Sequence, residues 1–204
     1  MELHPTYVML FEMLMETVGA SISFLTAYYS LKAFRLSGRG PLLYLHFGFT
    51  VLGVSMMSRV FGSLYIISAI AMPVSVRGVV GLISTACGVM RAVAYGLFAA
   101  AYSGERRVEM AVLIPLLVNP YTEFVCVAVM VYVVAQSAIN HAFVKTSESL
   151  LVFVAFLLML VSHVMFAMSH VRAMLYLLAH VSQLAGFISM LTMLLKVGRE
   201  VGEG

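Results

Sequence analysis

The sequence predicts an all-α protein that is integral to a membrane, with six transmembrane helices packed as a bundle. Of its 204 residues, 62% are hydrophobic and 10% are charged, whereas a soluble domain usually contains about 25% charged residues. The mean hydropathy is +1.03. A soluble fold of this length could not keep so much apolar surface away from water. We therefore expect a single transmembrane helical domain over residues 1–204.

The apolar sequence is divided into stretches long enough to cross a bilayer, each of which requires roughly 20 residues. A polar turn with two glycines precedes Pro41, which suits the first turn of a helix. Pro73 ends the second stretch, and Ser103-Gly104 ends the third. The expected spans are residues 7–34, 41–70, 76–103, 121–143, 149–168 and 173–196.

The segment 106–118 is expected not to cross the membrane. Its apolar part, 110–118, contains Pro115 and is followed by Asn119-Pro120. About nine residues of helix cannot cross a hydrocarbon core about 30 Å thick. The segment is therefore interpreted as a short interfacial or re-entrant piece, with both of its ends on the same side.

The loops indicate a multi-pass protein of the cell membrane with both termini outside. Cytoplasmic loops carry an excess of Lys and Arg, and six spans produce a small excess on one side. The chain start lacks the positive region of a cleavable signal peptide. The expected cytoplasmic side holds Lys32, Arg35, Arg39, Arg106, Arg107 and Arg172, and the other side holds Arg77, Lys145, Lys196 and Arg199.

Three histidines are candidate cofactor ligands. With six spans, His46, His163 and His180 enter from the same side to depths of roughly 8 to 12 Å at 1.5 Å per residue. Neutral imidazole is a common metal ligand, so the three could hold the iron of a b-type haem between helices. The alternatives are interhelical hydrogen bonds and a proton relay. His170, one heptad after His163, is a further candidate at the turn.

Buried charges form the second candidate site. Glu12 and Glu16 are four residues apart and share one helix face, while Arg59 and Arg91 lie inside the second and third spans. Since a lone charge in the bilayer is costly, we expect an acid of the first helix to pair with one of these arginines. The cluster either fixes helix packing or lines a polar path.

Glu123 and the cysteines have simpler interpretations. Glu123 lies in the first turn of the fourth span, where it either caps the helix or supports a histidine as a neighbouring partner. Cys87 and Cys126 lie in apolar stretches and are expected to be small core residues.

Two functions are compatible with these candidate residues, and a purely structural role is a third possibility. The first is a haem-binding electron-transfer subunit of a respiratory or redox assembly. The second is a small transporter or channel subunit that uses Glu12, Glu16, Arg59 and Arg91. The third possibility is a non-catalytic structural subunit. A stand-alone enzyme is disfavoured because the Gly-x-Ser-x-Gly and His-Glu-x-x-His patterns are absent. The expected partners are the lipid bilayer and other membrane subunits or further copies of the chain, and scattered Lys and Arg argue against nucleic acid.

Overall fold

The computed structural model describes residues 5–69, 76–102, 122–169 and 173–202. Within these ranges the protein is all-α, and six of its helices are long and apolar enough to cross a membrane. This confirms the expected fold class, and the helix bounds agree with the expected spans to within a few residues at most ends. The helices are α1 (Pro5–Ser37), α2 (Gly40–Ala69), α3 (Val76–Tyr102), α4 (Thr122–Val144), α5 (Ser147–Met168) and α6 (Ala173–Gly202).

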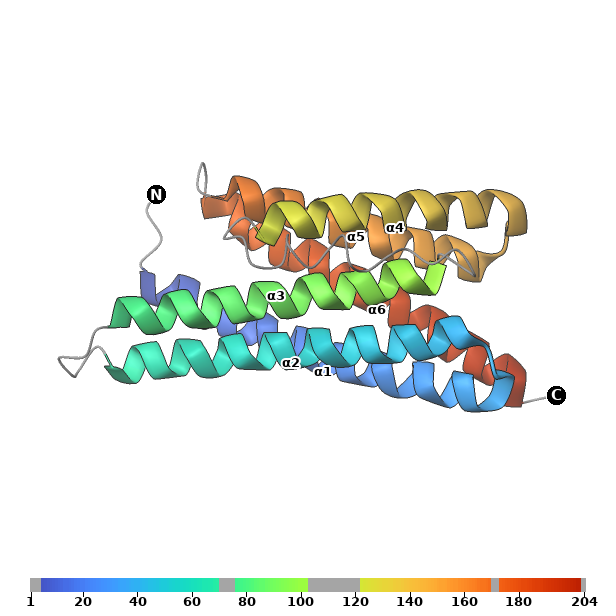
Figure 1. Ribbon diagram of the computed structural model, residues 1–204, viewed down its shortest axis with the longest axis horizontal. Coiled ribbons are helices and arrows are strands. Elements are labelled where there is room, and N and C mark those ends of the chain that lie inside the picture. Colours follow the sequence, from blue (N-terminus) through green and yellow to red (C-terminus); the bar gives the residue numbers. More distant parts are fainter. Residues whose placement is uncertain (1–4, 70–75, 103–121, 170–172, 203–204) are drawn as a thin grey trace.

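Tight turns join α1 to α2 and α4 to α5. Gly38 has a φ of 68°, and its N–H donates to the Phe34 carbonyl at 2.8 Å, which is the left-handed cap that glycine favours at a helix end. Lys145 adopts a similar φ of 52° after α4. Thr146 then caps α5 through a reciprocal capping box with Ser149. Both turns force the chain to reverse, so each pair of helices is antiparallel (Figure 1).

The directions of the remaining helices follow from side-chain contacts. Tyr95 meets His163, and Tyr102 meets Phe156, so α3 and α5 are antiparallel. Since α4 is also antiparallel to α5, α3 and α4 must run in the same direction, as Figure 1 shows. The start of α4 therefore lies beside the middle of α3, where Glu123 pairs with Arg91, and away from the end of α3 at Tyr102 (Figure 1).

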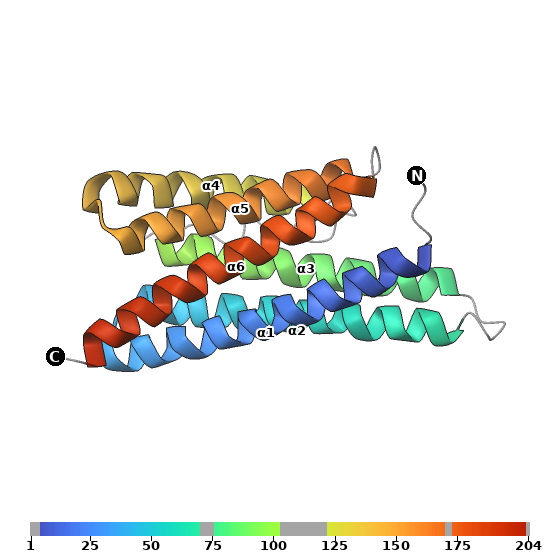
Figure 2. The ribbon, with the colours of Figure 1, turned by 180° about the vertical axis from the view of Figure 1, so that it is seen from behind.

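Two topology expectations need correction. Residues 103–121, including 106–118, lie outside the described residues, but the helix ends that flank them do not lie at one level as expected: the start of α4 lies beside the middle of α3. The start of α1 and the end of α6 also lie at opposite ends of the bundle (Figure 2), whereas the expected topology places them at the same end. Both differences arise because α4 packs parallel to α3, so that Glu123 of α4 lies level with Arg91 of α3.

An aromatic layer crosses the interior of the bundle. We give this name to Phe49, Phe98, Phe156 and Phe187, which come from α2, α3, α5 and α6 and are fully buried. The ring centroids of Phe98 lie 4.7 Å from Phe49 and 5.6 Å from Phe156, and those of Phe49 and Phe187 are 6.2 Å apart. Such contacts add to the stability of a packed core, so the layer ties four helices together.

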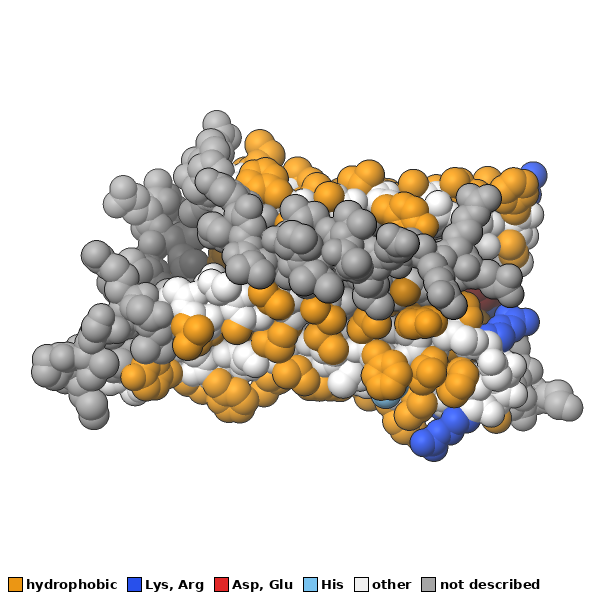
Figure 3. Space-filling model, in the orientation of Figure 1, with side chains coloured by type: hydrophobic (Ala, Val, Ile, Leu, Met, Phe, Trp, Pro, Cys, Tyr) orange, Lys and Arg blue, Asp and Glu red, His pale blue; other side chains and the backbone are white. Residues whose placement is uncertain are grey.

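The outer surface suits lipid. Large hydrophobic side chains such as Leu14, Phe61, Leu82 and Phe124 are exposed on different helices. In Figure 3, hydrophobic side chains cover much of the described visible face, and the Lys and Arg side chains lie at its right-hand end. Contiguous apolar surface of this extent is unusual for soluble monomers, and with the six spans it establishes a multi-pass membrane protein.

Candidate functional site: a buried charge network

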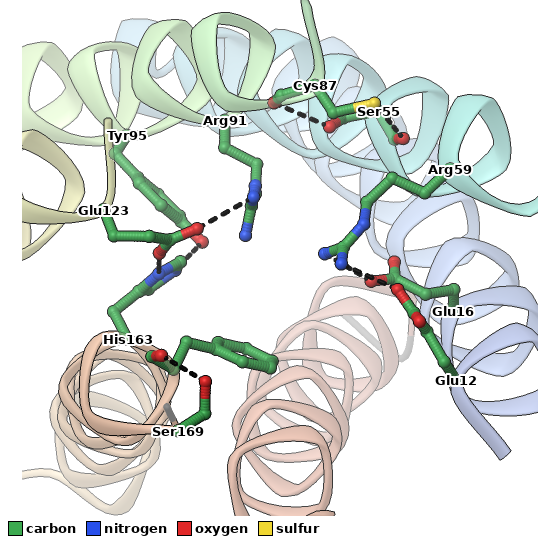
Figure 4. A network of polar contacts seen from close by, with 11 residues as sticks. Glu12, Glu16, Ser55, Arg59, Cys87, Arg91, Tyr95, Glu123, His163 and Ser169 are labelled. Atoms are coloured by element: carbon green, nitrogen blue, oxygen red, sulfur yellow. Dashed lines mark hydrogen bonds and ion pairs between the residues drawn. The ribbon is translucent and has the colours of Figure 1, made fainter. Parts of the chain in front are cut away.

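Glu123 lies at the centre of a polar chain contributed by three helices. Its Oε1 pairs with the Arg91 guanidinium at 2.8 Å, and its Oε2 accepts from His163 Nδ1 at 2.8 Å. The other ring nitrogen of His163, Nε2, is hydrogen-bonded to the Tyr95 hydroxyl. Arg91 and Tyr95 are four residues apart on α3 and so share a face. The result is a continuous chain Arg91–Glu123–His163–Tyr95 (Figure 4).

Most of this chain is deep inside the protein, while the Glu123 side chain is 28% exposed. His163 and Tyr95 are fully buried, and Arg91 is 8% exposed. Buried polar groups are costly unless they are hydrogen-bonded, and buried charges are costly unless they are paired. The charges of Arg91 and Glu123 are paired, and His163 and Tyr95 are hydrogen-bonded through the same chain. Both interpretations of Glu123 therefore have support, because it lies in the first turn of α4 and also contacts a histidine.

A second cluster surrounds Arg59 on α2. Its NH2 lies 2.7 Å from Glu12 Oε1, and its NH1 lies 2.9 Å from Glu16 Oε1. The expected ion pair between the first helix and Arg59 is therefore present, and both acids take part. The Glu16 side chain is 3% exposed, so Arg59 compensates a carboxylate that water barely reaches. Tyr176 of α6 also contacts Glu12.

The two clusters face one another across an interior space. In Figure 4 the side chains of Arg59 and Arg91 point toward each other from α2 and α3. A cavity of about 260 Å³ lies beside them and is lined by both arginines, Glu12 and Cys87. Arg91 Nε is buried and has no hydrogen-bond partner among the described residues. The cavity thus joins the two clusters into one polar region.

Among the described residues, the charges of this region do not balance. Glu12, Glu16 and Glu123 provide one more carboxylate than Arg59 and Arg91 provide guanidinium groups. A region within the bilayer is most stable when its net charge is close to zero. One additional proton, held by His163 or by a carboxyl group, would restore neutrality. From the sequence, two acids and two arginines were expected in the cluster, and Glu123 was not counted among them.

The three candidate histidines do not converge. The ring of His46 is bonded through Nδ1 to the Ala27 carbonyl at 2.9 Å, near the α1–α2 turn. His163 and His180 lie in the other half of the bundle, where both contact Phe166. The separation arises because α4 is parallel to α3, which reverses α5 and α6 relative to the expected direction. His170 lies outside the described residues.

The donor set does not fit the expected haem clamp. Axial ligation requires a free ring nitrogen on each of two facing histidines, but both nitrogens of His163 are engaged by Glu123 and Tyr95. His180 Nε2 is buried without a hydrogen-bond partner among the described side chains, and aromatic rings pack around it. Within the described ranges, no group of three or more His, Cys, Asp or Glu is arranged to hold a metal ion.

The cysteines pack as expected. Cys87 and Cys126 are free thiols and are each 1% exposed. Ser55 Oγ donates to the Cys87 carbonyl at 3.0 Å, and the Cys87 thiol donates to the Ser55 carbonyl at 3.5 Å. These reciprocal bonds fasten α2 to α3 beside the charge network.

Comparisons with known proteins give no relative: no protein-family model, curated protein or solved structure matches this chain.

Proposed function

We propose that the protein is a small membrane transporter or channel subunit that carries protons through its buried charge network. The observation that supports this most directly is the position of His163, whose two ring nitrogens connect Glu123 to Tyr95 inside the bundle. Imidazole gains and loses a proton near neutral pH more readily than other side chains. A histidine held between an acid and a phenol is therefore suited to pass a proton along.

The charge imbalance gives the proton a place to reside. With His163 neutral, the three acids and two arginines carry a net negative charge. Binding one proton neutralises the region and releasing it restores the charge. Intramembrane chains of Glu and His with such neighbours are typical of proton relays in pumps and transporters.

The aromatic layer supplies a closed gate between two cavities. Tyr95 ends the polar chain, and its ring centroid lies 5.9 Å from that of Phe98. Phe98 contacts Phe156, which in turn contacts Tyr102 in the wall of a larger cavity at the other end. Hydrophobic constrictions of this kind gate channels by excluding water. Passage would require these rings to move.

The arrangement of basic residues supports an orientation. The α1–α2 turn, the α4–α5 turn and the end of α6 lie at one end of the bundle. At the opposite end, Arg77 is the one Lys or Arg near a helix end among the described residues. Because Lys and Arg accumulate on cytoplasmic ends, the first end faces the cytoplasm. The start of α1 is then outside, and the end of α6 is inside. The basic residues at the first end are Lys32, Arg35, Arg39, Lys145, Lys196 and Arg199.

Proton flux into proteoliposomes tests the proposal. The purified protein is reconstituted with a pH-sensitive dye inside, and a potassium diffusion potential drives protons inward. Wild-type protein should acidify the lumen faster than empty liposomes, His163→Gln should abolish the difference, and His46→Gln, a matched change at the other end, should preserve it. If wild-type protein carries no protons, or if both variants behave alike, the network is structural.

A further inference from the structure

A large cavity opens at the basic end of the bundle and is separate from the charge network. Its volume is about 890 Å³, and all six helices contribute to its wall. Its deepest described side chains are apolar, among them Leu45 and Leu194, which are 5% and 1% exposed. Lys32 and Arg39, both exposed, lie at its mouth beside the α1–α2 turn. The cavity therefore has an apolar floor and a basic rim.

The basic rim has no acidic partner among the described residues. No carboxylate of the described residues lies within ion-pair distance of Lys32 or Arg39. Glu148, the acid in the cavity wall, is paired with Lys196 instead. Within the described part of the lining, two cations thus face a cavity whose one acid already has a partner.

Helix α4 adds polar groups to another part of the cavity wall. Gln136 and Asn140 line the cavity from α4, and their spacing of four residues places both side chains on one helix face. Their amides can donate hydrogen bonds to an oxygen-rich group. A ligand held at the rim would therefore meet cations from α1 and the turn on one side and amide donors on the other.

From these features we infer that the cavity binds an anionic lipid, with its phosphate group at Lys32 and Arg39 and an acyl chain against the apolar floor. Ligand pockets usually enclose about 300–1,000 Å³ and combine a mainly apolar lining with a few polar groups. Basic pockets between transmembrane helices on the cytoplasmic side are sites for anionic headgroups. This inference does not depend on proton transport, because the cavity lies beyond the aromatic layer from His163.

Native mass spectrometry of the full-length protein tests the inference. The protein in detergent is titrated with phosphatidylglycerol or with phosphatidylcholine of the same acyl chains, and bound lipid is counted after mild activation. Wild-type protein should retain phosphatidylglycerol in preference to phosphatidylcholine. The double variant Lys32→Gln/Arg39→Gln should weaken phosphatidylglycerol binding by at least about tenfold, because both cations that face the phosphate group are removed.

A matched double variant separates the site from general attraction. Arg35→Gln/Lys145→Gln removes the same charge from the same end, but neither residue lines the cavity. Its affinity should stay within about twofold of wild type, and circular dichroism should show equal helix content for both variants. Equal losses in the two variants, or no preference of wild-type protein between the lipids, would overturn the inference.

A competition with inorganic phosphate identifies the source of the anion. Because the acyl chain contributes through the apolar floor, millimolar phosphate should leave bound phosphatidylglycerol in place. Displacement of the lipid by inorganic phosphate alone would instead identify a site for a soluble anion, and the lipid assignment would be wrong.

Discussion

Arg91 in the middle of α3 pairs with Glu123 in the first turn of α4, at a distance of 2.8 Å. This pair is possible because α3 and α4 run in the same direction with α4 displaced along the axis (Figure 1). An antiparallel α4 would instead place Glu123 near Tyr102. This ion pair therefore indicates the direction of α4, and with it the end of the bundle at which the α4–α5 turn lies.

Cysteine labelling should place the α4–α5 turn on the same side as the α1–α2 turn. Cysteines introduced at Arg39 and at Lys145 should react with a membrane-impermeant maleimide from the cytoplasmic side, and a cysteine at Tyr7 should react from outside. The native Cys87 and Cys126 are buried and are replaced by Ala to remove background. Labelling of the Lys145 position together with that of Tyr7 would contradict the parallel arrangement of α3 and α4.

Replacing Arg59 with Ala should strongly destabilise the fold. The change leaves Glu16, whose side chain is 3% exposed, without its cation. Breaking a buried ion pair by removing one partner costs about 3–5 kcal/mol. The free energy of unfolding in mixed micelles measures the loss. Adding Glu16→Gln to Arg59→Ala should restore part of it, because the uncompensated carboxylate is then gone.

The control for this experiment is Arg35→Ala at the exposed end of α1. Surface changes away from special contacts usually stay within about 0.5 kcal/mol. If Arg59→Ala were no more harmful than Arg35→Ala, the cluster around Arg59 would not contribute to stability.

Gly186 allows α6 to approach α5 closely, so Gly186→Ala should be destabilising. A Cβ at this position would lie 2.8 Å from the Ala155 carbonyl oxygen, a backbone atom that cannot move alone. Overpacking of this kind costs about 1–3 kcal/mol. Gly81→Ala on α3 is the matched control, since a Cβ there meets nothing within 4 Å. Thermal unfolding in detergent should lower the Tm of the first variant only; an equal Tm in both would show that the helices separate at little cost.

Lys145→Gly should stabilise the α4–α5 turn. Lys145 has a φ of 52°, a left-handed conformation that costs a residue with a side chain roughly 1–2 kcal/mol and that glycine adopts freely. The same substitution at Lys32, which lies within α1, should instead be destabilising because glycine is a poor helix former. Chemical denaturation of both variants gives the comparison, and a loss of stability in Lys145→Gly would argue against strain at this turn.

The helices and the cluster around Arg59 were predictable from sequence. Long apolar runs broken by Pro41, Pro73 and glycine turns fix where each span begins and ends, because the bilayer requires a minimum length. The pairing of Glu12 and Glu16 with Arg59 was also accessible. It depends on helical spacing and on one tight turn between neighbouring helices, both of which are local properties of the chain.

The chain Arg91–Glu123–His163–Tyr95 was not predictable in the same way. The direction of α4, and with it of α5 and α6, depends on how the chain passes from Tyr102 to Thr122, and apolar length alone does not determine this. The expected convergence of His46 with His163 and His180 assumed the wrong direction. The signal that could have indicated the arrangement is Arg91, because a buried base requires an acid at its own depth, and Glu123 was the remaining candidate in the adjacent span.

Nuclear magnetic resonance of the histidine ring nitrogens tests the central claim most directly, namely that the buried network exchanges a proton. Protein labelled with ¹⁵N-histidine is reconstituted in lipid bilayers and followed from acidic to alkaline pH, and the resonances lost in His163→Gln identify His163. The network account predicts that His163 changes its protonation state within this range and that Glu123→Gln shifts the transition, because the two side chains share a hydrogen bond. His163 resonances that stay unchanged at every pH, in wild type and in Glu123→Gln alike, would contradict it.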